Sequence, residues 1–501
     1  MKKGLGVALV VVAAGFCLLW YLPYFHNQFQ IGFFAYTRTF VRAFFEGPWT
    51  GRAESAGLVA ATGLHPRIGE FLWRFVSQFY INTPCILLAA GLVTAAFCRL
   101  SWAVVREYTL LLLPVFFYFF TNPEPAMAGW SMYLLLGMGL LALCVRIFRW
   151  RFRLGADGGW GRLAGALAAF ACVPVFVFCA HHNTLEINLL QVRQAACAGN
   201  YERCFEISDR VCRERAGVPL DEETEAVQVQ RMEMTAWLKL SLLQTGRLNN
   251  MFLEYGDVPL MGGMFGSDFP YMNECAYPYV LLQDCLGVYA PQVPFILSSF
   301  EKKGWQNRFV EPLLRAELHT GQGRLLQKSL RYASRTLAHR KVALEMPCAV
   351  EDGSRPVPLQ SASLVRGGNH LDGWVKLYAE GFPGKPAEMS VPLWEYYTLL
   401  CLLEKRLDRV EFLAEQASQL GCKTLPAYMQ EAVCFMRNYP SSLSRKQMLE
   451  TPYKGYHLNL NVLEEVEDVY RTWALYHIGK MDFMEASRLY RHTFTFRFYF
   501  L

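Results

Sequence analysis

The chain has 501 residues, of which 53% are hydrophobic and only 18% charged. This composition excludes disordered, collagen-like and mucin-like proteins. A formal net charge of +6 over this length is too weak a field for a nucleic-acid-binding protein. The chain is therefore predicted to be a membrane protein, or a protein with a membrane part.

The hydrophobic residues are concentrated in the first third of the chain. Residues 1–181 hold 14 basic and 6 acidic residues, a balance of +8, whereas the remainder holds 35 basic and 37 acidic residues, a balance of −2. We therefore expect a transmembrane region over 1–181 and a domain with its own core over 182–501.

Five apolar runs in the first region predict about five membrane spans in an all-α fold. A span takes about 20 residues. The runs cover residues 5–24, 80–97, 108–120, 130–147 and 163–180. The third is short but is assigned as a span. The first carries no small-residue cleavage site, which favours an uncleaved signal-anchor over a signal peptide.

Basic residues in the short loops predict the orientation of the spans. Lys2 and Lys3 precede the first span, and arginines crowd the gap between the fourth and fifth, whereas 121–125 carries no cation. Basic loops favour the cytoplasm, so the N-terminus is predicted inside and the domain after residue 181 outside. If residues 108–120 do not cross the membrane, the domain after residue 181 is predicted on the cytoplasmic side instead.

The loop over 25–78 is too long for a plain turn, and the segment 47–51 divides it. Its first half is rich in phenylalanine, and its second half repeats apolar residues at helical spacing from Ile68 to Val76. Both halves are predicted to form amphipathic helices, either lying in the membrane interface or packing against the bundle.

The domain over 182–501 is predicted to consist of helix pairs joined by short turns. The spacing of Phe483, Ala486 and Tyr490 is similar to that of the tetratricopeptide repeat, and Tyr201, Cys204 and Ser208 follow it more loosely. The domain is predicted to be a tetratricopeptide-like α-solenoid, with an irregular helical-repeat domain as the alternative. Either would offer a surface for a protein partner.

Two long loops, 256–278 and 347–392, interrupt these helices. Long loops in compact domains are usually functional or disordered. They supply the candidate partner-binding residues Phe265 and Tyr271 in the first loop, and Arg366, His370 and Asp372 in the second. A solvated loop without a site is the alternative for the second group.

Motifs of known chemistry are missing from the sequence. It contains no phosphate-binding G-x-x-x-x-G-K-[ST], no G-x-S-x-G, no H-E-x-x-H and no C-x-x-C, so neither a metal nor a cofactor is predicted. Cys197, Cys204 and Cys212 permit a disulfide, but buried free cysteines are favoured.

Three glutamates in the first outer loop are the candidate catalytic residues: Glu46, Glu54 and Glu70. Membrane glycosyltransferases that use lipid-linked sugars place a catalytic acid and interfacial helices in such a loop, and this chain is similar to them in layout. That layout supports the alternative function of an envelope enzyme acting on a lipid-linked glycan.

Three short motifs carry a resemblance over nearly the full chain. Asn27-Gln28-Phe29-Gln30, Gly69-Glu70-Phe71-Leu72 and Ser77-Gln78-Phe79-Tyr80, with an aromatic tail over 493–501, resemble a family of bacterial inner-membrane proteins of unknown function. The resemblance implies a multi-span N-terminus and a tetratricopeptide-like C-terminal region, and it brings no catalytic residues. The leading prediction is a non-enzymatic scaffold or assembly factor of the bacterial inner membrane, in contact with membrane lipid and a protein partner.

Overall fold

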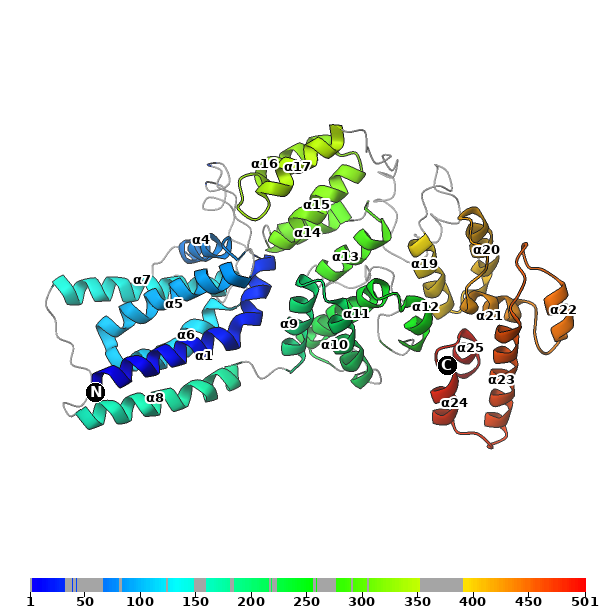
Figure 1. Cartoon of the computed structure of the whole chain (residues 1–501), viewed down its shortest axis with the longest axis horizontal. Coiled ribbons are helices and arrows are strands. Elements are labelled where there is room, and N and C mark those ends of the chain that lie inside the picture. Colours follow the sequence, from blue (N-terminus) through cyan, green and yellow to red (C-terminus); the bar gives the residue numbers. More distant parts are fainter. Residues whose placement is uncertain are drawn as a thin grey trace. The chain divides into compact units, whose positions relative to one another are not determined.

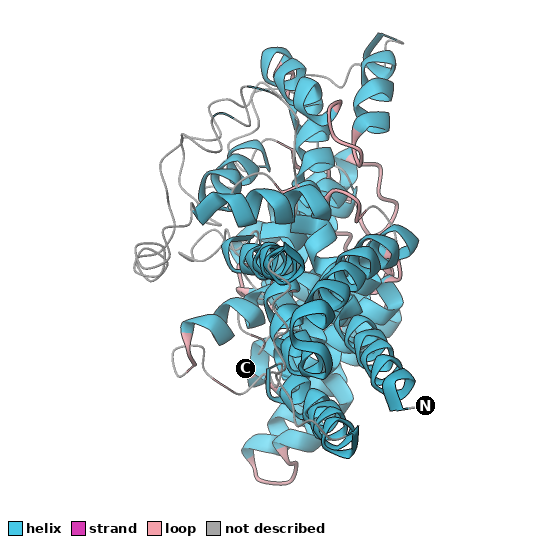
Figure 2. Ribbon diagram, turned by 90° about the vertical axis from the view of Figure 1, so that its left-hand side faces the viewer, coloured by secondary structure: helices cyan, strands magenta, loops and turns pink. Residues whose placement is uncertain are grey.

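The computed structural model is helical throughout the part of the chain that it describes (Figure 1, Figure 2). The described residues are 2–31, 38, 42, 66–80, 83–122, 125–147, 159–180, 184–215, 218, 223–255, 258, 276–289, 292–303, 306–351 and 391–501. Among these residues no β-strand occurs, and one isolated bridge pairs Tyr453 with Tyr456. The predicted all-α fold is confirmed for this part of the chain.

Contacts between residues divide the chain into two units. The first comprises residues 1–194, 300–318 and 322–355, and the second comprises residues 195–299, 319–321 and 356–501. The first interval ends at residue 194, inside helix α9 (Thr184–Cys197), whereas the predicted boundary follows residue 181.

Three helices of the first unit are long and apolar enough to cross a membrane. They are α1 (Lys2–Ile31), α5 (Thr83–Val105) and α7 (Pro125–Ile147). Their apolar stretches contain 19, 23 and 21 residues, close to the roughly 20 that a hydrocarbon core requires. Membrane association through these helices is the part of the predicted topology that the structure supports.

The two other predicted spans are helical but shorter in their apolar part. Helix α6 (Thr109–Phe120) has 12 residues, and the apolar stretch of α8 (Gly159–Ala180) is Gly165–Val177. The predicted start of the second span at residue 80 was too early. Helix α5 begins at Thr83 because Pro84 suits a first helical turn, where its missing N–H needs no partner.

Packing inside the bundle follows the helical period of α1. Its buried face carries Val10, Ala13, Cys17, Tyr21 and Tyr24, spaced three or four residues apart. The Tyr21 ring stacks on Phe117 of α6, with centroids 5.6 Å apart. The opposite face exposes apolar residues: Val11, Val12 and Leu19. An apolar outer face around a packed interior is what a bundle in lipid requires.

The remaining helices of the described part are short to medium in length. Their bounds are α10 (Tyr201–Glu214), α11 (Glu225–Gln244), α12 (Leu248–Met251), α13 (Ala276–Leu286), α14 (Gln292–Lys303), α15 (Asn307–His319), α16 (Gly323–Ala333), α17 (Arg340–Glu351), α19 (Val391–Leu403), α20 (Val410–Gln419), α21 (Ala427–Met436), α22 (Arg445–Glu450), α23 (Leu460–His477), α24 (Phe483–Tyr490) and α25 (Phe494–Phe500). Gly199, between α9 and α10, and Gly479, between α23 and α24, have φ values of 70° and 71°, a conformation that glycine adopts without strain.

The small residues of the two repeat-like patterns are buried. Ala486 of α24 is fully buried and packs in a cluster with Val469 of α23 and Phe496 of α25. Cys204 and Ser208 of α10 are also fully buried. These contacts are those expected of paired helices, while the identification of a repeat stays a prediction.

Both predicted long loops are shorter at their ends than expected. Helix α13 already includes residues 276–278 of the first loop. Helix α17 continues through Pro347 to Glu351, and α19 begins at Val391, so both ends of the second loop are helical. Pro392 lies in the first turn of α19, where proline is tolerated.

Candidate functional site

Helix α4 (Pro66–Ser77) carries the only candidate catalytic residue that lies in the described part of the chain, Glu70. The helix forms where the spacing of apolar residues predicted one. Ile68 and Phe75 remain about two-fifths exposed, whereas Trp73 is fully buried in the bundle core. One side of α4 therefore packs on the bundle and the other stays open.

Helix α4 contacts α7 backbone to backbone at two glycines. A Cβ atom added to Gly69 would lie 2.4 Å from the carbonyl oxygen of Gly129 and 2.6 Å from a ring carbon of Tyr133. No side chain fits at this contact, so glycine is required for the approach. Of the two arrangements left open for α4, the structure shows packing against the bundle.

Glu70 is held by an arginine one turn along the same helix. Both Nε and Nη2 of Arg74 lie 2.9 Å from Glu70 Oε1. The Glu70 side chain is 19% exposed and the Arg74 side chain 7%. The indole Nε1 of Trp73 donates to the carbonyl oxygen of Phe120 at 3.4 Å. A carboxylate engaged by a guanidinium is suited to positioning and charge balance, since its Oε1 lone pairs are already occupied.

Two further polar side chains, Gln78 and Tyr80, lie in the turn after α4. Gln78 is 3% exposed and Tyr80 fully buried, while Phe79 between them is 40% exposed. We call these two side chains, together with Glu70 and Arg74, the α4 layer. Gln78 and Tyr80 belong to a motif quoted from the sequence, although neither was predicted as a site residue.

The other candidate residues lie outside the described residues. They are Glu46 and Glu54 in the first outer loop, Phe265 and Tyr271 in the first long loop, and Arg366, His370 and Asp372 in the second. Within the described part, no group of three or more His, Cys, Asp or Glu side chains is arranged to hold a metal ion. Among the described residues, Cys197, Cys204 and Cys212 take part in no disulfide.

The second unit holds a site that sequence reasoning missed, at the short aromatic helix α25. Thr493 caps this helix by accepting a hydrogen bond from the Phe496 N–H at 3.0 Å. Phe494, Thr495 and Phe496 are fully buried. Helix α25 packs against α19, α21 and α23, and we call the surface that these three helices present to it the α25 groove.

A buried glutamate binds the first turn of α25. Glu431 of α21 accepts hydrogen bonds from both the backbone N–H and the hydroxyl of Thr495, each at 2.8 Å. A carboxylate at a helix N-terminus is stabilised by free N–H groups and by the helix dipole. Burial nevertheless raises the pKa of Glu431 to about 7, against the lowering effect of the Thr495 hydrogen bonds.

The other end of α25 is fixed by an arginine and by aromatic contacts. The Arg497 guanidinium donates from Nε and Nη2 to the carbonyl oxygen of Leu403, at 3.1 and 2.9 Å. That carbonyl belongs to the last residue of α19, where helix carbonyls lack intrahelical partners. The Phe498 ring lies 4.4 Å from that of Phe435. Polar contacts at both ends and rings along the side thus hold one short helix.

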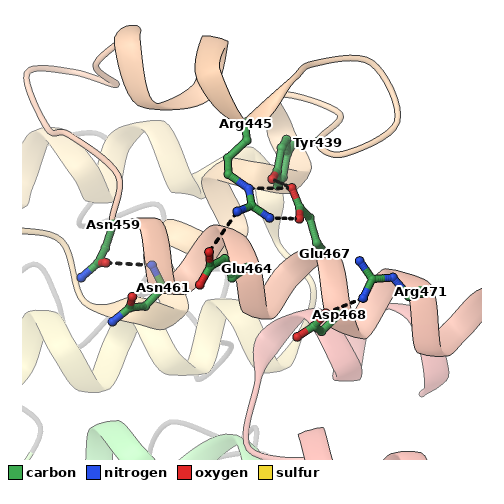
Figure 3. Close-up of polar contacts among 8 residues, drawn as sticks. All are labelled: Tyr439, Arg445, Asn459, Asn461, Glu464, Glu467, Asp468 and Arg471. Atoms are coloured by element: carbon green, nitrogen blue, oxygen red, sulfur yellow. Dashed lines mark hydrogen bonds and ion pairs between the residues drawn. The ribbon is translucent and has the colours of Figure 1, made fainter.

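A network of ion pairs joins α22 to α23 (Figure 3). Arg445 at the start of α22 donates to Glu464 at 2.9 Å and pairs with Glu467, both on α23. The Tyr439 hydroxyl donates to Glu467 as well. Ser444 begins α22 with a capping box completed by Gln447. The network fixes α22 on α23 and lies on a partly exposed surface, so we assign it a structural role.

Comparison with protein-family models, with curated proteins and with solved structures finds no match to this chain. The resemblance to a bacterial inner-membrane family therefore stays a prediction.

Proposed function

We propose that this protein is a membrane-anchored scaffold or assembly factor whose second unit binds a protein partner through a short aromatic helix. The partner would present a helix of the chemistry of α25: a threonine at or near its N-terminus, followed by alternating aromatic residues. The unit would be a tetratricopeptide-like repeat domain, which commonly recognises peptides on a concave face.

The observation that carries this proposal is the way in which α25 is held. Glu431 binds its first turn, the α19 carbonyl of Leu403 binds Arg497, and buried rings fill the space between. Helix-in-groove recognition in protein complexes uses the same elements, an apolar face with polar contacts that set its register. A groove built for the chain's own helix is suited to a similar helix from a partner.

The anchor of this scaffold would be a bundle of five spans in a bacterial inner membrane, with the N-terminus in the cytoplasm and the second unit outside. The three long apolar helices support the anchor. Reporter fusions at Asp157 and at the C-terminus would report opposite sides if this topology holds. The same side at both positions would overturn it.

A peptide-binding experiment tests the proposed function. In a chain ending at His492, the α25 groove should be open, and a labelled peptide of residues 491–501 should bind with an affinity on the order of micromolar. Circular dichroism would establish that the shortened chain is folded. Glu431→Ala in the same chain should weaken binding, whereas Arg445→Ala, outside the groove, should leave it unchanged.

The full chain gives a second readout of the same proposal. Thr495→Val with Arg497→Ala removes three of the tail's polar contacts and should increase crosslinking of an envelope protein to a photoreactive residue at position 435. If the peptide does not bind the shortened chain and the loosened tail does not change crosslinking, the groove serves only to complete the fold.

A second candidate function is a membrane enzyme acting on a lipid-linked glycan, and Glu70 supports it because it is the candidate catalytic acid that lies in the described part of the chain. Glu70→Gln keeps the shape of the side chain and removes its charge. Loss of a cellular phenotype at an unchanged protein level would support the enzyme, and a silent substitution would leave it without a described catalytic residue.

A further inference from the structure

The turn after α4 directs two neighbouring polar side chains to the interior. The backbone N–H groups of Phe79 and Tyr80 donate to the carbonyl oxygens of Val76 and Ser77, each at 3.1 Å. This tight turn leaves Phe79 at the surface and buries Gln78 and Tyr80 on either side of it. Both side chains are therefore directed away from solvent.

None of the polar atoms of these two side chains has a hydrogen-bond partner in the described structure. This holds for Nε2 and Oε1 of Gln78 and for the Tyr80 hydroxyl. A buried polar group without a partner costs about 1–3 kcal/mol, and native proteins rarely leave one unexplained. Three such atoms within one turn point to a bound molecule that completes their hydrogen bonds.

The chemistry of these atoms restricts what this molecule is. Glu70 and Arg74 balance each other's charge, so the layer has no free cation to attract an anion. The Gln78 amide needs both an acceptor for its NH₂ and a donor for its oxygen. A fully ionised phosphate provides acceptors alone, whereas a hydroxyl group provides a donor and an acceptor.

Aromatic rings pack close to Tyr80. The ring centroid of Phe25 lies 6.1 Å from that of Tyr80 and 5.3 Å from that of Phe120. Trp73 is buried in the same core cluster. Apolar and aromatic surroundings with a few polar groups are typical of small-molecule sites.

We infer that the α4 layer binds a hydroxyl-rich group, with the Gln78 amide paired to neighbouring hydroxyls and the Tyr80 hydroxyl to another. Two sources supply this chemistry, the sugar headgroup of a glycolipid and a free sugar. The inference concerns the first unit and is independent of peptide binding by the second. It also holds whether or not Glu70 takes part in a reaction.

Lipid retention by the full-length protein tests this inference. The protein would be reconstituted in phosphatidylcholine nanodiscs containing glucosyl diacylglycerol, and retained lipids measured by native mass spectrometry. The wild type should retain the glucosyl lipid in preference to phosphatidylcholine. Gln78→Leu with Tyr80→Phe should lower retention about tenfold, the equivalent of losing roughly one net hydrogen bond.

Thr94→Val is the matched control, because Thr94 of α5 is another buried residue whose hydroxyl has no partner in the described structure. It should leave lipid retention unchanged. In detergent without a sugar lipid, the Gln78/Tyr80 variant should melt no lower than the wild type, since it removes unsatisfied groups; this establishes that it folds.

Free glucose distinguishes the two sources. A rise in melting temperature with glucose, seen in the wild type and lost in the Gln78/Tyr80 variant, would assign the site to a free sugar. Retention of the glucosyl lipid without a glucose effect would assign it to a lipid headgroup. Equal retention by wild type and variant, with no glucose effect in either, would overturn the inference.

Discussion

Each unit holds a glutamate with little exposure to solvent, and its carboxylate is bound in a different way. In the α4 layer Glu70, which is 19% exposed, contacts a guanidinium one helical turn away, at 2.9 Å. In the α25 groove the buried Glu431 accepts hydrogen bonds from the N–H and hydroxyl of Thr495. The first solution is complete within one helix, whereas the second joins two helices far apart in sequence. A carboxylate bound by a residue of its own helix stabilises that helix. A carboxylate bound by a residue far away in the sequence stabilises the contact between the two helices.

The largest effect is expected where α4 meets α7. Gly69→Ala places a Cβ atom 2.4 Å from the backbone oxygen of Gly129, and no rotamer relieves a clash with backbone. We expect a loss of about 3 kcal/mol in the free energy of unfolding, measured by thermal denaturation in detergent. Gly137→Ala in α7, where nothing lies within 4 Å of the new atom, is the control and should be neutral or stabilising. Equal melting of the two variants would contradict the backbone contact.

The second prediction concerns the pH dependence of the α25 groove. Burial raises the pKa of Glu431 from 4.5 to about 7, so the folded state favours the protonated form. The contribution of Glu431 to the free energy of unfolding is fully present below pH 4.5 and is lost as the pH rises to about 7. The total loss is about 3 kcal/mol. Thermal melts from pH 4.5 to 7.5 should show a smaller decline for Glu431→Gln than for the wild type.

The groups facing Glu431 set the control for this experiment. Glu465 raises its pKa and His492 lowers it, and the His492 Nε2 atom lies 3.1 Å from Glu465. The pKa of His492 is itself raised by Glu465, so its contribution is also lost with rising pH. His492→Gln should therefore also reduce the decline in stability with rising pH. If wild type and Glu431→Gln decline in parallel, Glu431 does not titrate in this window.

The third prediction tests neutralisation within α4. Arg74→Met leaves the Glu70 carboxylate without its cation in a largely buried position, and should cost about 2 kcal/mol. The double variant Arg74→Met with Glu70→Gln should recover much of this loss, because it removes the unpaired charge. A double-mutant cycle on melting free energies measures the coupling. Additive effects would show that the pair contributes nothing.

The smallest effect is expected at the ion-pair network in Figure 3. Arg445 is 40% exposed, so water screens its contacts with Glu464 and Glu467. Arg445→Ala should lower the melting temperature slightly, and less at high salt than at low salt. A loss as large as that of Arg74→Met would show that the network, and not Glu431, holds the groove together.

Local patterns predicted the local structure. The apolar spacing from Ile68 to Val76 predicted α4, and the short turns predicted between helices are present at Gly199 and Gly479. Glu70 was selected for another reason, its place in the first outer loop, which resembles the loop of membrane glycosyltransferases in layout. The apolar spacing did not indicate that α4 would lie against α7, because an amphipathic helix suits lipid and protein equally well.

Contacts between residues far apart in the sequence could not be predicted. Nothing near Glu431 indicates that its partner is Thr495, and the aromatic tail was noted as a resemblance and not as a ligand for a groove. Gln78 and Tyr80 were quoted in a motif, but their missing hydrogen-bond partners are visible only once burial is known. In both cases the decisive fact is tertiary, since a side chain's partners depend on elements brought together by folding.

The contact of Gly69 with Gly129 also has a consequence for evolution. Glycine is required at both positions, because a Cβ atom at either one would clash with the backbone of the opposite helix. Two distant positions are therefore under one constraint, and substitutions there are expected to occur together or not at all. In related chains that carry larger residues at both positions, α4 should no longer contact α7 closely. Covariation of this pair is thus a record of the helix contact that can be read without a structure.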